Sequence, residues 1–427
     1  VFKELNGKVF IWMPLSCFVK RWVLAQRFRG AALILSNEIR APIVPLPHRL
    51  REISVKIIAD QSVPLVTELF GPYGDVQLLS GREISAVDIV DADILLVRSV
   101  TQVDANLLEG SPVKFVGSAT IGTDHVDLDY LQAEGVCFAH APGCNAQSVV
   151  QYDFSVMTKL MPDWQTKTVG IVGCGNVGGR LLRALLSIGV DCRVYDPYLA
   201  GDSGIMTTDF ESVLDSDILC LHTPLTVSGL YPTFHLLDAT ALSKLKPGAL
   251  LINAGRGAVV DNKALLDLLK GGVDLVVALD VWEPEPMVDV ELLQYVSMAS
   301  PHIAGYSLEG KVNGTSMIFD TFVEWQGTRQ NKSNIVKLDD MAVCPVVISS
   351  VEDAILASFD ISADDNRMRL ILEGIEPGSP RVGAHFDQLR KEYPVRREWA
   401  SMVFNAERLN LSMKDRLTLT SLGFNLC

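Results

Sequence analysis

The chain has no uninterrupted run of 18 apolar residues, the length that a membrane-spanning helix requires. It also has no Cys-x-x-Cys pair among its eight cysteines, and no histidines and cysteines at the spacing of a zinc site. We therefore expect no membrane span, no metal site, and the reduced thiols of a cytoplasmic protein. Positive charge is scarce too: the chain has 37 Lys and Arg but 51 Asp and Glu, which gives a net charge of −14. Nucleic acid and anionic membranes are poor partners for such a chain.

The first 54 residues have a different composition from the rest. They carry nine Lys and Arg and three Glu, a net charge of +6, so the remainder carries −20. No small-residue cleavage site follows a clear apolar segment, which disfavours a targeting peptide. We expect residues 1–54 to be an appendage outside the folded protein, either disordered or the result of a misassigned start.

From Val55 onward, short runs rich in β-branched residues alternate with helical patterns. The predicted strands are 55–59, 93–99, 113–118, 168–173, 192–196, 217–222, 249–254 and 274–280. Each run is almost continuously apolar, as in strands buried on both faces of a parallel sheet. The alternation with helices, such as 177–188 and 262–269, predicts doubly wound α/β domains.

The α/β pattern breaks once, near Pro142–Asn145, before a predicted helix at 146–160, and ends near Pro301. A long helical pattern follows at 308–325, then a polar, linker-like stretch at 327–334. Beyond it lies a region with a charged, helix-like stretch at 385–399. We predict two Rossmann-like domains with a cleft between them. The first spans 55–145 and is completed by 302–326, and the second spans 146–301. A third region, of α+β type, spans 332–427.

A glycine-rich turn lies between a predicted strand and a predicted helix, with the sequence Gly173-Cys174-Gly175-Asn176-Val177-Gly178. In this context the glycines allow a dinucleotide to approach the backbone, and the helix N-terminus offers free N–H groups to a pyrophosphate. Asp196 ends the next strand and is 18 residues past Gly178. A carboxylate there accepts hydrogen bonds from ribose hydroxyls and repels a 2′-phosphate, which favours NAD over NADP. The alternative is a turn without a ligand.

Three polar clusters follow the later strands, at Asn253–Gly257, Asp280–Pro286 and Ser300–Tyr306. Ligands of open α/β sheets bind at these carboxyl ends. The order N-x-x-R-G-x-x-V-D, D-V-W-E-x-E-P, P-H-I-A-G resembles the D-2-hydroxyacid dehydrogenase family. Further segments are similar to members that act on 4-phospho-D-erythronate: VRSVT (97–101), FVGSATIGTDHVD (115–127), APGCNA (141–146), HIAGYSLEGK (302–311) and FDQLRKEY…RREW (386–399).

The resemblance implies a catalytic group of three residues. His302 is expected to be the base that takes the hydroxyl proton, since imidazole titrates near working pH. Glu285 is expected to orient the ring and stabilise the imidazolium, with Glu283 as the competing acid. Arg256 is expected to bind the substrate carboxylate and polarise the C2 oxygen. We expect His125 and His222 to support loops around the cofactor rather than to carry protons.

The resemblance also implies ligand contacts. Those to NAD are Gly173, Gly175, Asn176, Val177, Gly178, Asp196, Thr223, Ala254, Gly255, Arg256, Asp280 and Gly305. Those to the substrate are Ser99, Thr120 and Tyr306. Arg98 is a candidate for a substrate anion, or for a structural salt bridge. The basic run at 390, 391, 396 and 397 is either a solvated helix face or part of the active site of a second subunit.

The function that we expect is oxidation of 4-phospho-D-erythronate with NAD, a step toward pyridoxal 5′-phosphate. The enzymatic alternative is another D-2-hydroxyacid, such as 3-phosphoglycerate. An alternative of a different class is a non-catalytic, NADH-sensing scaffold like a corepressor, which the presence of all three catalytic residues disfavours. Because relatives pair, and the third region carries no catalytic motif, we expect it to form a homodimer.

Overall fold

The computed structural model describes residues 2–5, 8–11, 55–199, 201, 203–327, 342–343, 347–404 and 410–426. The chain divides into two units, Val1–Ile53 and Ser54–Cys427. In the first, β1 (Phe2–Leu5) pairs antiparallel with β2 (Lys8–Ile11), a hairpin that we did not predict. Most of the expected appendage, and nearly all of the predicted linker at 327–334, lie outside the described residues.

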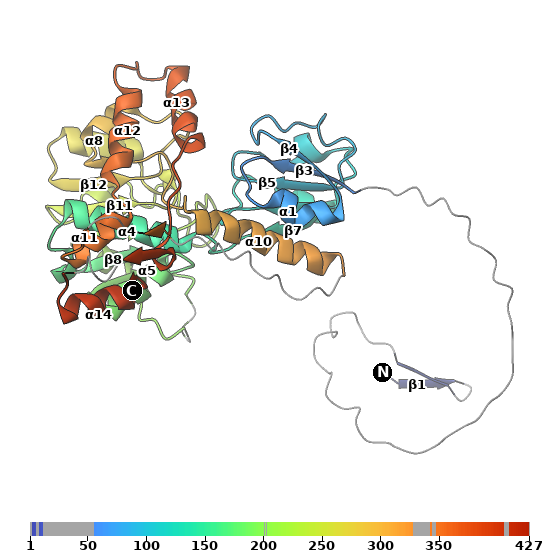
Figure 1. Cartoon of the computed structure of the whole chain (residues 1–427), viewed down its shortest axis with the longest axis horizontal. Helices are drawn as coiled ribbons and strands as arrows, with labels where there is room; N and C mark the ends of the chain where they lie inside the picture. Colours follow the sequence, from blue (N-terminus) through green and yellow to red (C-terminus); the bar gives the residue numbers. More distant parts are fainter. Residues whose placement is uncertain are drawn as a thin grey trace. The chain divides into compact units, whose positions relative to one another are not determined.

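A five-stranded parallel sheet lies within residues 55–145, in the order β4-β3-β5-β6-β7. Its strands are β3 (Lys56–Asp60), β4 (Asp75–Leu79), β5 (Ile94–Val97), β6 (Phe115–Ser118) and β7 (Cys137–His140), and its helices are α1 (Val66–Phe70), α2 (Ala105–Leu108) and α3 (Leu128–Ala133). The later helix α10 (Leu308–Trp325) packs on β6 and β7 (Figure 1). Its Phe322 joins Phe70 and Phe115 in one aromatic cluster, which ties α10 to this sheet.

A six-stranded parallel sheet follows, in the order β13-β12-β11-β10-β8-β9. Its strands are β8 (Val169–Val172), β9 (Cys192–Tyr195), β10 (Ile218–Leu221), β11 (Ala249–Asn253), β12 (Leu275–Leu279) and β13 (Met298–Ala299). Its helices are α4 (Ala146–Leu160), α5 (Gly178–Ser187), α6 (Phe210–Leu214), α7 (Ala239–Leu242), α8 (Asn262–Lys270) and α9 (Val290–Tyr295). The strand order reverses between β8 and β10, which is where open α/β sheets bind dinucleotides.

The third region combines helices with a small parallel sheet, in the order β14-β15-β16. Its elements are β14 (Ala342–Val343), α11 (Val351–Ser358), α12 (Ser362–Leu372), α13 (Pro380–Lys391), β15 (Met402–Phe404), α14 (Met413–Leu422) and β16 (Asn425–Leu426). Short 3₁₀ helices lie at Gly71–Tyr73, Trp164–Thr166, Gly257–Val259 and Trp399–Ser401. Trp399 is buried and stacks on Phe424 in a core shared with α4 and α5.

The predicted fold class, two parallel α/β sheets with an additional C-terminal region, is confirmed. All eight predicted strands are present. The helix expected at 385–399 was wrong in its limits, because α13 spans Pro380–Lys391. Ser379 caps its start, and Pro394 stands shortly after its end. Proline restricts the residue before it to extended backbone and lacks an N–H, so 392–399 cannot continue the helix.

Two absences concern the described residues alone. None of their helices combines the length and hydropathy that crossing a bilayer requires. Within the same part of the chain, no group of three His, Cys, Asp or Glu residues is arranged to hold a metal ion.

Candidate active site

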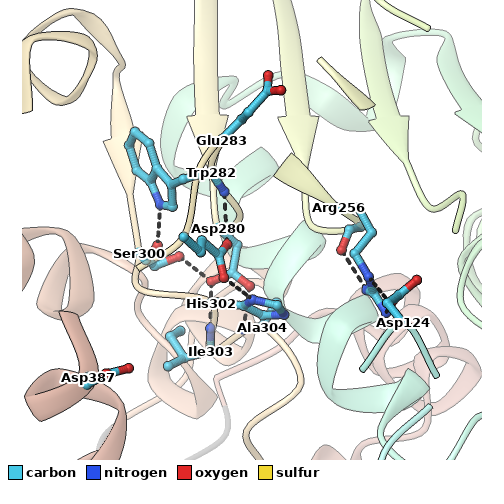
Figure 2. A network of polar contacts seen from close by, with 12 residues as sticks. Asp124, Arg256, Asp280, Trp282, Glu283, Ser300, His302, Ile303, Ala304 and Asp387 are labelled. Carbon is cyan, nitrogen blue, oxygen red and sulfur yellow. Dashed lines mark hydrogen bonds and ion pairs between the residues drawn. The ribbon is translucent and has the colours of Figure 1, made fainter. Parts of the chain in front are cut away.

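The proposed catalytic and cofactor-contacting side chains follow neighbouring strands of the six-stranded sheet. Thr223 follows β10, Arg256 follows β11, Asp280 follows β12 and His302 follows β13. Since these strands are parallel, their carboxyl ends share one edge of the sheet. Figure 2 shows Arg256, Asp280 and His302 beyond the tips of the strand arrows. The fold therefore gathers at one edge residues that are far apart in the sequence.

His302 and Glu285 form a hydrogen-bonded pair. The Nδ1 atom of His302 lies 2.7 Å from Oε2 of Glu285, whose Oε1 accepts the backbone N–H of Trp282 at 2.9 Å. Burial raises the pKa of Glu285, but the charge and hydrogen bond of His302, the charge of Arg390 and the Trp282 amide outweigh it and hold that pKa below its usual value. The carboxylate is thus an acceptor for Nδ1–H, which leaves Nε2 for a substrate. His302 keeps 32 % of its side chain exposed.

The competing acid, Glu283, lies in a different ion pair. Its two carboxylate oxygens are each 2.9 Å from Nε2 of His235. In Figure 2 its side chain points away from His302. Glu283 is half-buried in this pair. The geometry thus matches the choice of Glu285 as the partner of His302.

Asp280 holds the loop that carries His302. This carboxylate is 1 % exposed, and it accepts N–H groups from Ile303 at 2.8 Å and Ala304 at 2.9 Å. It also accepts the hydroxyl of Ser300 at 2.6 Å, and its backbone oxygen accepts the N–H of His302 at 2.7 Å. Figure 2 shows this set of bonds around Asp280. A contact between Asp280 and the cofactor remains a prediction, whereas its contact with the loop is direct.

Arg256 is paired with Asp124, a residue from the loop that follows β6. Its Nε and Nη2 atoms each lie 2.8 Å from Oδ2 of Asp124, and Nη1 donates to the backbone oxygen of Gly255 at 2.9 Å (Figure 2). A Cβ atom on Gly122 would lie 1.9 Å from Nη2 of Arg256, so any other residue there would displace the guanidinium from this position. Sequence reasoning missed Asp124, although it is part of the GTDH motif that we quoted.

Each of the three glycines in the turn after β8 has a different structural role. Gly173 has φ +87°, in the left-handed region that favours glycine. A Cβ on Gly178 would lie 1.9 Å from the backbone oxygen of Gly173, so the helix start and the turn need a hydrogen at this position. At Gly175 a Cβ would meet nothing within 4 Å. The second glycine therefore serves something outside the protein's own packing, as a pyrophosphate cradle requires.

The other residues of the cofactor site fit NAD. The start of α5 at Val177 has no side-chain cap, so the positive end of the helix is open to a phosphate, although the N–H groups of Gly179 and Arg180 already donate to the backbone oxygens of Gly175 and Val177. Asp196 accepts the amides of Cys174 at 2.8 Å and Tyr198 at 3.0 Å, which fixes the carboxylate at the end of β9. The Thr223 hydroxyl is inaccessible to solvent and has no partner among the described residues. Such an orphaned group is expected to bond a ligand.

The remaining predicted cofactor contacts lie around the same edge. Asn176 is exposed in the turn, and Ala254 and Gly255 follow β11 directly, half-buried. The Gly255 N–H donates to the side chain of Asn253 at 3.2 Å. A Cβ on Gly305 would lie 2.1 Å from Nδ2 of Asn145, so Gly305 is needed to pack the loop after His302.

The predicted substrate residues lie on the five-stranded sheet and after His302. The Thr120 hydroxyl contacts Ser118 Oγ at 2.7 Å, and Ser118 contacts Nε2 of His125 at 2.9 Å. Ser99 is exposed at the end of β5. Arg98 donates to the fully buried Asp60 from Nε at 2.9 Å and Nη2 at 3.3 Å, so in this structure it forms the salt bridge that we kept as its alternative role.

The two supporting histidines are both buried. Burial lowers the pKa of His125 to about 4, and this neutral ring supports the loop of Thr120. Nε2 of His222 lies 3.1 Å from Oδ2 of Asp153, a fully buried residue of α4. Burial raises the pKa of Asp153, and the positive field of His222 opposes that effect. His125 thus supports the loop of Thr120, whereas the supporting role of His222 stays a prediction.

The comparisons with known proteins agree with this arrangement. Residues 145–304 match the family model described as the NAD-binding domain of D-isomer specific 2-hydroxyacid dehydrogenases, and residues 342–423 match a domain of unknown function, DUF3410. The chain is 47 % identical over 380 residues to an erythronate-4-phosphate dehydrogenase of Cellvibrio japonicus, covering 87 % of this chain and 99 % of that protein. It is 45 % identical to one from Teredinibacter turnerae, with the same coverage.

Solved structures support the fold. The D-lactate dehydrogenase of Aquifex aeolicus, in complex with NAD and lactic acid, aligns with a TM-score of 0.55 at 22 % identity. The alignment covers 64 % of this chain and 96 % of that one. At this level of identity the likeness concerns the fold alone, that is, the two parallel sheets and their connections.

Proposed function

Because the chain belongs to the erythronate-4-phosphate dehydrogenases of the D-isomer specific 2-hydroxyacid dehydrogenase family, we propose that it oxidises 4-phospho-D-erythronate with NAD. The product is (R)-3-hydroxy-2-oxo-4-phosphobutanoate, on the route to pyridoxal 5′-phosphate. The observation that carries the proposal is the His302–Glu285 pair at the strand edge that also presents Arg256 and the glycine-rich turn.

The base of the reaction is Nε2 of His302. With Nδ1 held by Glu285, this second ring nitrogen accepts the C2 hydroxyl proton, and the carboxylate stabilises the imidazolium that forms. NAD, when bound, accepts the hydride from C2. The substrate alcohol thus loses one proton to His302 and one hydride to the cofactor, and becomes a ketone. In the reverse direction His302 returns the proton.

Arg256 binds the substrate carboxylate and polarises the C2 oxygen. Its planar guanidinium suits two oxygens at once. The pair with Asp124 engages Nε and Nη2, so an incoming carboxylate competes with Asp124 for this side of the guanidinium or shares it. Ser99, Thr120 and Tyr306 are proposed to contact the rest of the substrate.

Comparison of two hydroxy acids tests this function. Steady-state kinetics with NAD are measured for 4-phospho-D-erythronate and for 3-phosphoglycerate, and the product is identified by mass spectrometry. We expect a higher kcat/KM for 4-phospho-D-erythronate. A preference of more than about tenfold for phosphoglycerate, roughly 1.4 kcal/mol in transition-state binding, would end the assignment. Binding of NADH without turnover of any hydroxy acid would instead favour the scaffold.

We further propose a cytoplasmic homodimer, with the third region as the contact between subunits. Large apolar side chains exposed on this region support the proposal: Leu370 is 71 % exposed on α12, and Leu417 is 63 % exposed on α14. We also propose the domain limits 145/146 and 301/302. In their support, the last strand of the five-stranded sheet ends at His140, α4 begins at Ala146, and β13 ends at Ala299.

A further inference from the structure

The chain passes twice between its two large sheets, and the third region contacts both passages. The first passage lies between β7 and α4, and the second lies between β13 and α10, which packs on the five-stranded sheet. His302 is part of the second passage. The short segment at 396–398, between α13 and β15, bonds to the start of α4 and to the start of α10. Three parts of the chain that are remote in the sequence therefore meet beside the proposed catalytic histidine.

The side chain of Arg396 is buried where these passages meet. It is 6 % exposed, and its Cζ atom lies 4.3 Å from the centroid of the Phe359 ring. Its Nη2 atom donates to the hydroxyl of Ser148 on α4 and to the backbone oxygen of Ala304, two residues after His302. Arg396 is therefore not part of a solvated helix face, which was one of the two roles that we considered for its basic run.

Ala304 is held from two directions. Its N–H donates to the buried carboxylate of Asp280 at 2.9 Å. Its backbone oxygen accepts the hydroxyl of Ser148 at 2.8 Å as well as the guanidinium of Arg396. The backbone of His302, two residues earlier, is left-handed, a conformation that lasts only where the surrounding contacts hold it. The bonds to Ala304 thus help to fix the direction of the imidazole.

Stability alone does not explain an arginine at this position. Within the described part of the chain, the acceptors of its hydrogen bonds are all uncharged, and its Nε and Nη1 atoms are inaccessible to solvent and have no hydrogen-bond partner. The nearby carboxylate of Glu398 is bonded to Ser307 instead, at 2.8 Å. A buried charge with unsatisfied donors is destabilising, and an apolar side chain of similar size is often at least as stable. Arg396 is therefore better explained by what it holds in place.

We propose that Arg396 is a positioning residue for the reaction, which fixes the loop of His302 through Ala304 and so makes catalysis depend on the third region of the same subunit. The inference rests on the proposed function and deepens it. Because Arg396 acts on His302 through the backbone of the loop, we expect it to affect kcat rather than the binding of NAD or of the substrate.

The segment that carries Arg396 is itself fastened to the second passage. The backbone oxygen of Arg396 accepts the N–H of Leu308 at 2.9 Å. Nε of Arg397 donates to one carboxylate oxygen of Glu309 at 2.6 Å, and the other oxygen of Glu309 accepts the N–H of Glu398 at 3.0 Å. These bonds hold the segment against the first turn of α10, so the third region and the catalytic loop are expected to move together.

Substitution of Arg396 in the full-length enzyme separates positioning from stability. In Arg396→Met, Tm should stay the same or rise, because an apolar side chain replaces a buried charge and Ser148 still bonds to Ala304. The kcat for 4-phospho-D-erythronate, counted per site titrated with NADH, should fall about 10- to 100-fold, the loss expected from a small displacement of a catalytic group. KM and NADH affinity should stay close to those of the parent. Arg396→Lys, which keeps a charged donor, should retain most of the activity.

Two further variants complete the comparison. Arg367→Met removes a guanidinium of the same third region that bonds to Asp364 on its own helix, α12, and it should keep the parent's kcat per site. Ser148→Ala removes the other donor to Ala304 and should lower kcat per site about 3- to 10-fold, as for the loss of one hydrogen bond between uncharged groups. Ser148→Ala carries the test if Arg396→Met does not fold.

Amide hydrogen exchange gives a readout that does not depend on turnover. The peptide that contains residues 302–305, followed by mass spectrometry, should exchange faster in Arg396→Met than in the parent and in Arg367→Met. The reason is that the N–H groups of Ile303 and Ala304, which donate to Asp280, lose the support of Arg396 on the other side of the loop.

The outcomes separate the positioning role from the function. An unchanged kcat per site in Arg396→Met overturns the positioning role and leaves the function intact. A loss of NADH sites at unchanged kcat per site also overturns it, because it would mean a structural role, and so does an equal fall of kcat in Arg367→Met. If the parent does not oxidise 4-phospho-D-erythronate, the proposed function fails and the exchange measurement decides. Faster exchange in Arg396→Met then supports the role of Arg396 in holding the loop, and equal exchange overturns it.

Discussion

The position of the His302 ring depends on an unusual backbone conformation as well as on the hydrogen bond of its side chain. Its φ is +56°, a left-handed conformation that a non-glycine residue adopts at a cost of about 1–2 kcal/mol. The hydrogen bonds of Asp280 to the loop at 302–304 hold that conformation. Strain of this kind gathers at functional sites, where the surrounding contacts over-determine the geometry.

Removal of the imidazole tests the role of His302. His302→Ala should lower kcat about 10²- to 10⁴-fold, the contribution of a positioned acid–base group. NADH affinity, measured by fluorescence titration, should stay the same, because no bond holds the ring to the glycine-rich turn. Glu283→Ala is the matched control and should keep nearly full turnover, since Glu283 contacts His235 instead. An unchanged kcat in His302→Ala would remove His302 from the mechanism.

His125 predicts a pH dependence of stability. Burial lowers its pKa to about 4, so between pH 6.5 and 4 the unfolded chain binds a proton that the folded protein does not. The free energy of unfolding should therefore fall as the pH falls, by about 2 kcal/mol between pH 7.5 and pH 5 for this residue. Urea unfolding at both pH values should show a drop smaller by that amount in His125→Gln. Equal drops in both proteins would contradict this.

At the scale of single residues, sequence patterns predicted the catalytic residues but not the residues that those side chains contact in the fold. Arg256, Glu285 and His302 were predicted from motifs at strand ends. Asp124 was not, because its contact with Arg256 joins two sheets and no local pattern shows it.

Among the elements, the glycine-rich turn allows stability and cofactor binding to be tested separately, because two of its glycines should respond differently to alanine. In Gly175→Ala the methyl group meets no protein atom, so Tm should not change, but NADH should bind at least about tenfold more weakly, because the methyl group occupies the space of the pyrophosphate. In Gly178→Ala the methyl group collides with the Gly173 oxygen, so both Tm and NADH affinity should fall. Thermal unfolding and fluorescence titration measure the two quantities. Equal NADH affinity in Gly175→Ala and the parent would exclude the cradle.

The elements that escaped prediction did so for different physical reasons. The edge strand β4 has only exposed and half-buried residues instead of a buried run, and β13 is only two residues long. Helix α13 was misplaced because charged periodicity continues past Lys391 while Pro394 prevents the helix from doing so. Buried central strands such as β8 and β10 were easy to predict, because they are apolar on both faces.

For the whole molecule, we predict a homodimer. Size-exclusion chromatography with light scattering at micromolar concentration should give twice the 46.7 kDa mass of the chain. Leu417→Glu on α14 should shift the dimer toward monomer, because it places a charge on an exposed apolar position. Met206→Glu changes an even more exposed apolar residue outside the third region and is the control. A monomer at all concentrations would refute the assigned contact.

The central claim is that Arg256, Glu285 and His302 converge on one hydroxy acid held against NAD. The most direct measurement is a crystal structure of the His302→Asn variant with NAD and 4-phospho-D-erythronate. We predict the substrate carboxylate on Arg256, the C2 hydroxyl within about 3 Å of the side chain at 302, and C2 within about 3.5 Å of the nicotinamide ring. A substrate bound elsewhere, or side chains at 256 and 302 more than about 10 Å apart around it, would contradict the claim.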